Sequence, residues 1–80
     1  MSSAQNRLRQ VREIEVGALR LYMHIIQSID SSGRMDVARK LMTIARIGES
    51  FMIIADILEA EGDYDFGDIR AVIDGVYEEQ

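Results

Sequence analysis

Residues 13–31 read EIEVGALRLYMHIIQSIDS, and this stretch decides the fold. Its polar or small positions recur at alternating steps of four and three, which traces one stripe along an α-helix. The positions are Glu13, Gly17, Arg20, His24, Gln27 and Ser31. Almost every other residue is apolar, so this helix has to be covered from several directions, which a chain of 80 residues can hardly do alone. We therefore expect a subunit that completes its core with a partner.

The rest of the chain also follows a helical period. Proline is absent, and β-branched residues are mixed with Leu, Met, Ala, Arg and Glu, so we predict an all-α fold. The turn at Asp30–Gly33 is short, which favours two long antiparallel helices, a helical hairpin, with a short C-terminal helix against it. We predict a single domain over residues 1–80, with Ser2 as the first N-cap and helices over about 3–30, 33–61 and 67–79.

So small a domain needs help to stay folded, and the composition limits what can help. There is no cysteine and only one histidine, His24, which removes disulfides and zinc. We therefore expect a homodimer in which the hairpins build a helical bundle. The predicted interface residues are Leu19, Tyr22, Ile26, Ile29, Leu41, Ile44 and Phe51. Periodicity adds positions that face either the core or the interface: Val11, Ala18, Ile25, Ala45, Ile54, Leu58, Ile69, Val72, Ile73 and Val76.

Charge is divided unevenly along the chain, whose net charge is −5. Residues 1–47 hold eight basic and four acidic side chains, whereas residues 48–80 hold one basic and ten acidic side chains. If the hairpin turns at Ser31–Gly33, Arg20 comes near Arg46, and His24 comes near Arg39 and Lys40. We predict a partner-binding patch made of Arg20, His24, Arg39, Lys40 and Arg46, unless these side chains form a solvated face or the acidic third is the binding surface.

No pattern of residues supports an enzyme or a cofactor. His24 has no carboxylate or cysteine at the spacing of a metal ligand, and no serine has the partners of a catalytic triad. The segment after Asp63 departs from a calcium loop because its glycine, Gly67, is at the fifth position and its twelfth residue, Asp74, is not glutamate. We predict no catalytic residues, no metal ligands and no cofactor.

The leading hypothesis is a small non-enzymatic regulator or inhibitor that binds another protein. The first alternative is a dimeric helical nucleic-acid-binding protein that uses the basic stripe of the hairpin, although the long helices do not fit a compact helix-turn-helix. The second alternative is a structural subunit that assembles with itself. No apolar run approaches the length of a membrane span and no secretory signal is evident, so we expect no membrane partner and a cytoplasmic location.

Overall fold

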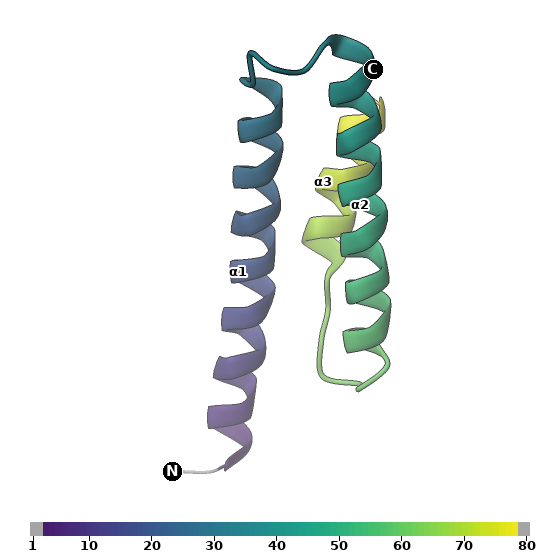
Figure 1. The fold of residues 1–80 in the computed structure, drawn as a ribbon. Coiled ribbons are helices and arrows are strands. Elements are labelled where there is room, and N and C mark those ends of the chain that lie inside the picture. The colour runs from purple at the N-terminus through teal and green to yellow at the C-terminus, as the bar shows by residue number, and fades with distance from the viewer. Residues whose placement is uncertain (1–2, 79–80) are drawn as a thin grey trace.

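The computed structural model of the chain describes residues 3–78, and side chains only as far as Gly75. These residues form three helices and no strand, which confirms the all-α prediction: α1 spans Ser3–Asp30, α2 spans Val37–Glu59 and α3 spans Gly67–Glu78. α1 and α2 lie side by side and run in opposite directions, and α3 lies behind them in the view of Figure 1. The predicted N-cap Ser2, the side chain of Val76 and the predicted end of the last helix at residue 79 fall outside the described residues.

α2 begins at Val37 rather than near Gly33, because Asp36 is its N-cap. The backbone of Asp36 is extended, and its side chain accepts a hydrogen bond of 2.8 Å from the backbone N–H of Arg39. Ser31, in the turn predicted between the two helices, donates its hydroxyl back to the carbonyl of Gln27 at 2.8 Å. The connection between the helices is therefore longer than predicted, which changes which residues of α1 and α2 lie opposite each other.

The core forms where all three helices meet. It consists of Tyr22, Ala55, Phe66, Ile69 and Ile73, each at most 3% exposed. The Tyr22 ring packs edge-on against Phe51 of α2, with 5.3 Å between ring centroids and 73° between planes. This contact sets the register of α1 against α2.

Most predicted core positions that the structure describes are at least partly buried. Val11, Ile29 and Ile44 are almost fully covered, in line with the prediction, whereas Leu41 is 41% exposed and Ile54 is 46% exposed. The molecule measures 51 × 20 × 18 Å, which is about two helix diameters across. So thin a body covers each long helix on one side only, and many apolar side chains therefore stay at the surface.

Candidate protein-binding surfaces

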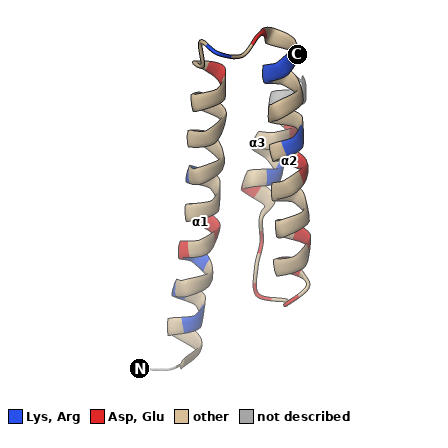
Figure 2. Ribbon diagram, viewed as in Figure 1, with Lys and Arg blue, Asp and Glu red and all other residues tan. Residues whose placement is uncertain are grey.

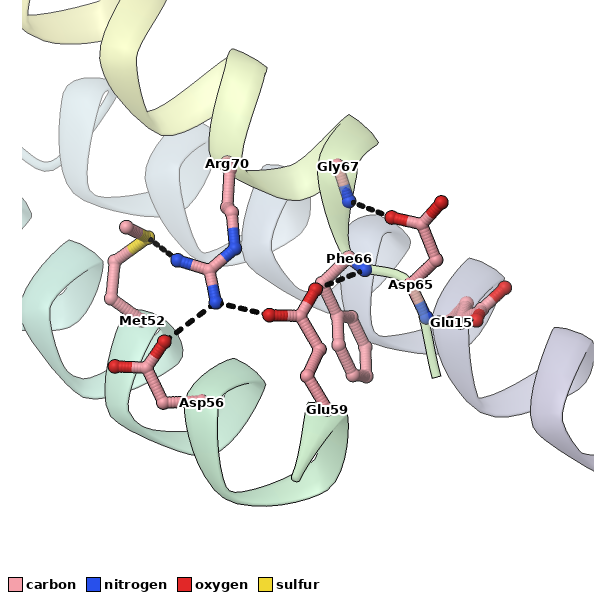
Figure 3. Close-up of polar contacts among 8 residues, drawn as sticks. All are labelled: Glu15, Met52, Asp56, Glu59, Asp65, Phe66, Gly67 and Arg70. Atoms are coloured by element: carbon pink, nitrogen blue, oxygen red, sulfur yellow. Dashed lines mark hydrogen bonds and ion pairs between the residues drawn. The ribbon is translucent and has the colours of Figure 1, made fainter. Parts of the chain in front are cut away.

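Arg70 is the centre of a polar cluster that joins α3 to α2 (Figure 3). Its Nη2 donates to Asp56 Oδ1 at 2.6 Å and to Glu59 Oε1, and its Nη1 points to the Met52 sulfur at 3.7 Å. The hydrogen bond to Asp56, followed by the hydrogen bond to Glu59, raises the pKa of Arg70. The one basic residue of the acidic third thus fixes α3 in place.

Glu59 and Glu15 hold the loop that leads into α3. The second oxygen of Glu59 accepts the backbone N–H of Phe66 at 2.9 Å, and this bond, together with Arg70, lowers the pKa of Glu59. Glu15 Oε2 accepts the N–H of Asp65 at 2.7 Å, so α1 also contacts this loop. Asp65 in turn accepts the N–H of Gly67 at 2.9 Å and so provides an acceptor for the first N–H of α3. These carboxylates are engaged in holding the loop, so the cluster is structural.

The fold brings the two charged halves of the chain together. Figure 2 shows basic residues along the N-terminal half of α1 and acidic residues along the loop between α2 and α3. Because α1 and α2 run in opposite directions, these segments meet, and Arg7 forms an ion pair with Asp63 at 3.2 Å. Part of the charge separation seen in the sequence is therefore neutralised within one molecule.

The five predicted partner-binding residues do not form one patch. Arg20 is two residues from Tyr22, about 200° around the helix, so it faces away from the core. Arg46 has the same relation to buried Ile44, so it also faces outward from its own helix's buried side. Lys40 Nζ donates to the carbonyl of Asp30 at 2.7 Å and closes the end of α1.

The remaining two residues of that prediction, His24 and Arg39, are exposed. The contact of Tyr22 with Phe51 shows that the middle of α1 lies opposite the middle of α2, whereas Arg39 lies near the connection. The structure therefore places His24 and Arg39 at different heights along the helices. The physical reason is the longer connection that ends at Asp36.

Four residues on the outer side of α2 combine apolar and basic side chains. Arg39, Met42, Arg46 and Ile53 follow one another at steps of three, four and seven, so they share one face, which we call the outer stripe. Met42 is 58% exposed and Ile53 is 59% exposed. Among the side chains of residues 3–75, neither guanidinium group of this stripe has an acidic partner within ion-pair distance.

α1 has a second apolar flank that α3 does not cover. Glu15 and Leu19 lie on the flank that faces the loop before α3, since both line a groove of about 460 Å³ together with Phe66. Ile14 lies one residue earlier than Glu15, about 100° around the helix, so buried Tyr22 separates the two flanks. The residues that share the flank of Ile14 follow at steps of four, three, four and three: Ile14, Ala18, Leu21, Ile25 and Ser28.

α2 repeats this arrangement. Ala55 points into the core at 1% exposure, and Asp56, one residue later, faces Arg70 of α3. Ile54, one residue earlier, therefore faces away from α3. Its flank carries Thr43, Ile47, Ser50, Ile54 and Ile57, again at steps of four, three, four and three. We call these two flanks together the open face; Figure 1 views the side of α1 and α2 that α3 leaves uncovered.

The residues predicted for a dimer interface fall mainly inside the single chain. Tyr22, Ile29 and Ile44 are at most 8% exposed. Leu19, Ile26 and Phe51 are half-buried against the core cluster, and Leu41 is 41% exposed. The sequence could not separate the two sets, because periodicity marks an apolar flank without saying which element covers it.

In comparisons with known proteins, no family model, curated protein or solved structure matches this chain. Where the structure describes side chains, in residues 3–75, no three histidine, cysteine, aspartate or glutamate side chains are grouped closely enough to hold a metal ion. None of the described helices combines the length and hydropathy that a bilayer crossing requires. The apolar surfaces of α1 and α2 are therefore the features of this structure that call for a functional explanation.

Proposed function

We propose that this protein is a small non-enzymatic regulator or inhibitor that acts by binding another protein, and that it does so as a homodimer. The observation that carries the proposal is the exposure of large apolar side chains at helical spacing on both long helices. They are Leu8, Ile14, Val16, Leu21, Met23, Val37, Leu41, Met42, Ile53, Ile54 and Ile57, each between 41% and 73% exposed. Ile53, Ile54 and Ile57 are neighbours on α2, and exposed apolar patches mark interaction sites on soluble proteins.

The gain from covering these side chains is large enough to support association. Full burial of an isoleucine or leucine contributes about 1.5–3 kcal/mol, so covering a side chain that is half exposed recovers about 1 kcal/mol. Leu21, Ile54 and Ile57 are 55%, 46% and 61% exposed, so each offers a gain of this size. Several such side chains covered together offset the entropy lost when two molecules associate, which one alone does not.

The outer stripe is the surface that we propose for the target protein. Arg39 and Arg46, which have no acidic partner among the described side chains, lie seven residues apart and frame Met42, whose unbranched side chain adapts to different apolar partners. An amphipathic helix with acidic residues at matching spacing complements such a stripe in charge and in apolar contact. We therefore expect an acidic helical segment in the target.

Photo-crosslinking from a benzophenone amino acid at Ile53 tests this surface in the cells that make the protein. We expect one covalent adduct with another protein, lost when Arg39 and Arg46 are both changed to glutamate. The same amino acid at Val37, which is 73% exposed but outside the outer stripe, is the control. If Ile53 gives no adduct, or if Val37 gives the same adduct undiminished by the two glutamates, target binding through the outer stripe is refuted.

Nucleic-acid binding is the second candidate, and one observation favours it. Arg9, Arg12 and Arg20 line one groove of about 340 Å³ on α1, and none has an ion-pair partner among the side chains described up to Gly75. Binding through these side chains would weaken steeply as salt rises, because it depends on neutralised phosphates. Absence of binding to duplex or single-stranded nucleic acid at low salt excludes this function.

A structural subunit that assembles with itself is the remaining alternative. It differs from a homodimer in forming large particles whose mass keeps rising with concentration. Light scattering across a concentration series separates the two, since the proposed dimer reaches a plateau at twice the 9.1 kDa of the chain.

A further inference from the structure

Gly17 is a glycine in the interior of α1 that the chain's own packing does not require. It is exposed, and its φ is not positive, unlike that of Gly62. A Cβ added at Gly17 would meet nothing within 4 Å. Glycine in the interior of a helix lowers stability relative to alanine. Neither the backbone conformation nor an internal contact therefore explains why glycine stands at this position.

Gly17 lines the same groove of about 340 Å³ as Arg9, Arg12 and Arg20. Val16 adds an apolar side chain to this groove and is 42% exposed. Arg20 faces away from the core, and Arg9 lies only about 20° from it around the helix, so the groove opens on the outer side of α1. The missing side chain of Gly17 thus leaves free space on an outer surface between guanidinium groups that have no acidic partner among the described side chains.

We propose that this groove binds an acidic amphipathic helix of another protein, which comes into close contact with α1 at Gly17. The distance between two packed helices depends on the side chains at the contact, so a glycine lets the partner helix come closer. Carboxylates of that helix then pair with Arg12 before Gly17 and with Arg20 after it. The site goes beyond the proposed function, since the groove shares no residue with the outer stripe.

The positions of the three arginines suit a partner helix that lies along α1. Arg9, Arg12 and Arg20 rise over about 17 Å of the helix axis and stay within about 80° around it. A helix with carboxylates at the same spacing reaches all three from one face. Exposed ion pairs are individually weak, so recognition depends on the three pairs together with the apolar contact at Val16 and Gly17.

Three observations favour a protein helix over nucleic acid at this groove. Glu13 also lines it and repels phosphates, whereas a protein segment can place an amide or a hydroxyl opposite this carboxylate. The net charge of −5 repels a long polyanion more than a short acidic helix. Val16 and Gly17 offer an apolar contact that a phosphate backbone does not use.

A helical peptide probe tests the site by fluorescence anisotropy. The probe is rich in alanine and carries glutamates at the spacing of Arg9, Arg12 and Arg20, read in both directions so that it fits either orientation. A control probe carries glutamine at these positions. All measurements use a chain with Arg39→Gln and Arg46→Gln, so that the outer stripe does not contribute. Physiological ionic strength screens charges more than about 8 Å apart.

One matched pair of charge reversals locates the binding. Arg20 lines this groove, Arg34 is exposed in the connection before α2, and reversal of either changes the net charge equally. We expect the glutamate probe to bind and the glutamine probe not to bind. Arg20→Glu then weakens binding at least fivefold, whereas Arg34→Glu changes it less than twofold.

Substitutions at Gly17 give a second readout that a merely structural role would not produce. Gly17→Ala raises the melting temperature of the free chain by several degrees, because alanine favours the helix and meets no neighbouring atom. Gly17→Leu fills the space and weakens binding of the glutamate probe at least fivefold. Gln27→Leu adds the same side chain at an exposed position of α1 outside the groove and leaves binding unchanged.

Several results would overturn the proposal. They are no binding of the glutamate probe, equal binding of the glutamine probe, equal losses from Arg20→Glu and Arg34→Glu, undiminished binding after Gly17→Leu, or a lower melting temperature of Gly17→Ala. A single-stranded oligonucleotide that binds through Arg9 and Arg20 while the glutamate probe does not would assign the groove to nucleic acid. None of these results touches target binding through the outer stripe, which the adducts from Ile53 test separately.

Discussion

Removal of the Tyr22 side chain is the sharpest test of how this small core is held. Tyr22 is 1% exposed and is the largest fully buried side chain, and it contacts elements that arrive from both α2 and α3. Replacing a buried aromatic residue by alanine costs about 3–5 kcal/mol. The stability of a chain of this length is about 4–12 kcal/mol in total, at about 0.05–0.15 kcal/mol per residue. Tyr22→Ala therefore removes a large part of the free energy of unfolding.

Urea denaturation followed by circular dichroism measures this loss. All variants are compared at one protein concentration, because self-association links stability to concentration. Met23→Ala is the matched control, since Met23 is the next residue and is 46% exposed, and we expect it to change stability by less than about 0.5 kcal/mol. A loss below about 1 kcal/mol for Tyr22→Ala, or equal losses for the two variants, would refute the placement of Tyr22 at the centre of the core.

The ring contact itself can be isolated from the rest of the burial. A double-mutant cycle with Tyr22→Leu and Phe51→Leu removes both rings while keeping apolar volume at both sites. We expect a coupling energy of about 0.5–1.5 kcal/mol, the range for edge-to-face aromatic pairs. A coupling energy of zero would contradict the register of α1 and α2 described above.

Three further changes test the ends of the helices and the polar cluster. Asp36→Ala removes the N-cap of α2 and lowers stability by about 1 kcal/mol in urea denaturation, whereas no loss would argue that α2 begins elsewhere. Gly62→Ala places a side chain at a φ of +95° and lowers the stability by about 1 kcal/mol or more. Gly33→Ala lowers the stability less, because Gly33 has a negative φ and open space around it. Equal melting temperatures of the two variants would contradict this expectation. The pKa of Glu59 is lowered, so ionised Glu59 stabilises the fold above the ordinary glutamate pKa, and this contribution is lost as pH falls through the lowered value. Glu59→Gln flattens that part of the stability curve against pH, and an unchanged curve would show that the carboxylate does not act through Phe66 and Arg70.

Several elements of the fold were open to prediction because they depend on local chemistry. The alternation of polar and apolar residues through 13–31 predicted the long first helix, and α1 ends at Asp30 as expected. The spacing from Ile69 to Val72 and Ile73 predicted α3. An aspartate just before an amphipathic run is typical of a helix start, and Asp65 accepts the N–H of Gly67. Each of these signals acts within a few residues.

Phe66 and Asp36 are two residues whose roles could not be predicted from their neighbours in the sequence. Phe66 lies in a segment whose acidic residues predict an exposed loop, yet its side chain is only 3% exposed. Glu59 accepts its backbone N–H, and its ring packs in the core. The predicted start of the second helix at residue 33 placed Asp36 inside that helix, whereas Asp36 is its N-cap, and only the path of the connection decides this. The predicted basic patch depended on that decision, since a longer connection moves Arg39 away from His24.

The order of residues by itself determined that this chain is helical, that its apolar surface exceeds what one thin molecule covers, and that its charges are separated along its length. Local hydrogen bonding and helical periodicity fix these properties before any long-range contact forms. Only the tertiary structure decided which apolar flank α3 covers, and so which flank remains open. That choice depends on where Arg70 meets Asp56 and Glu59 and where Phe66 enters the core, contacts between segments that no pattern along one helix specifies.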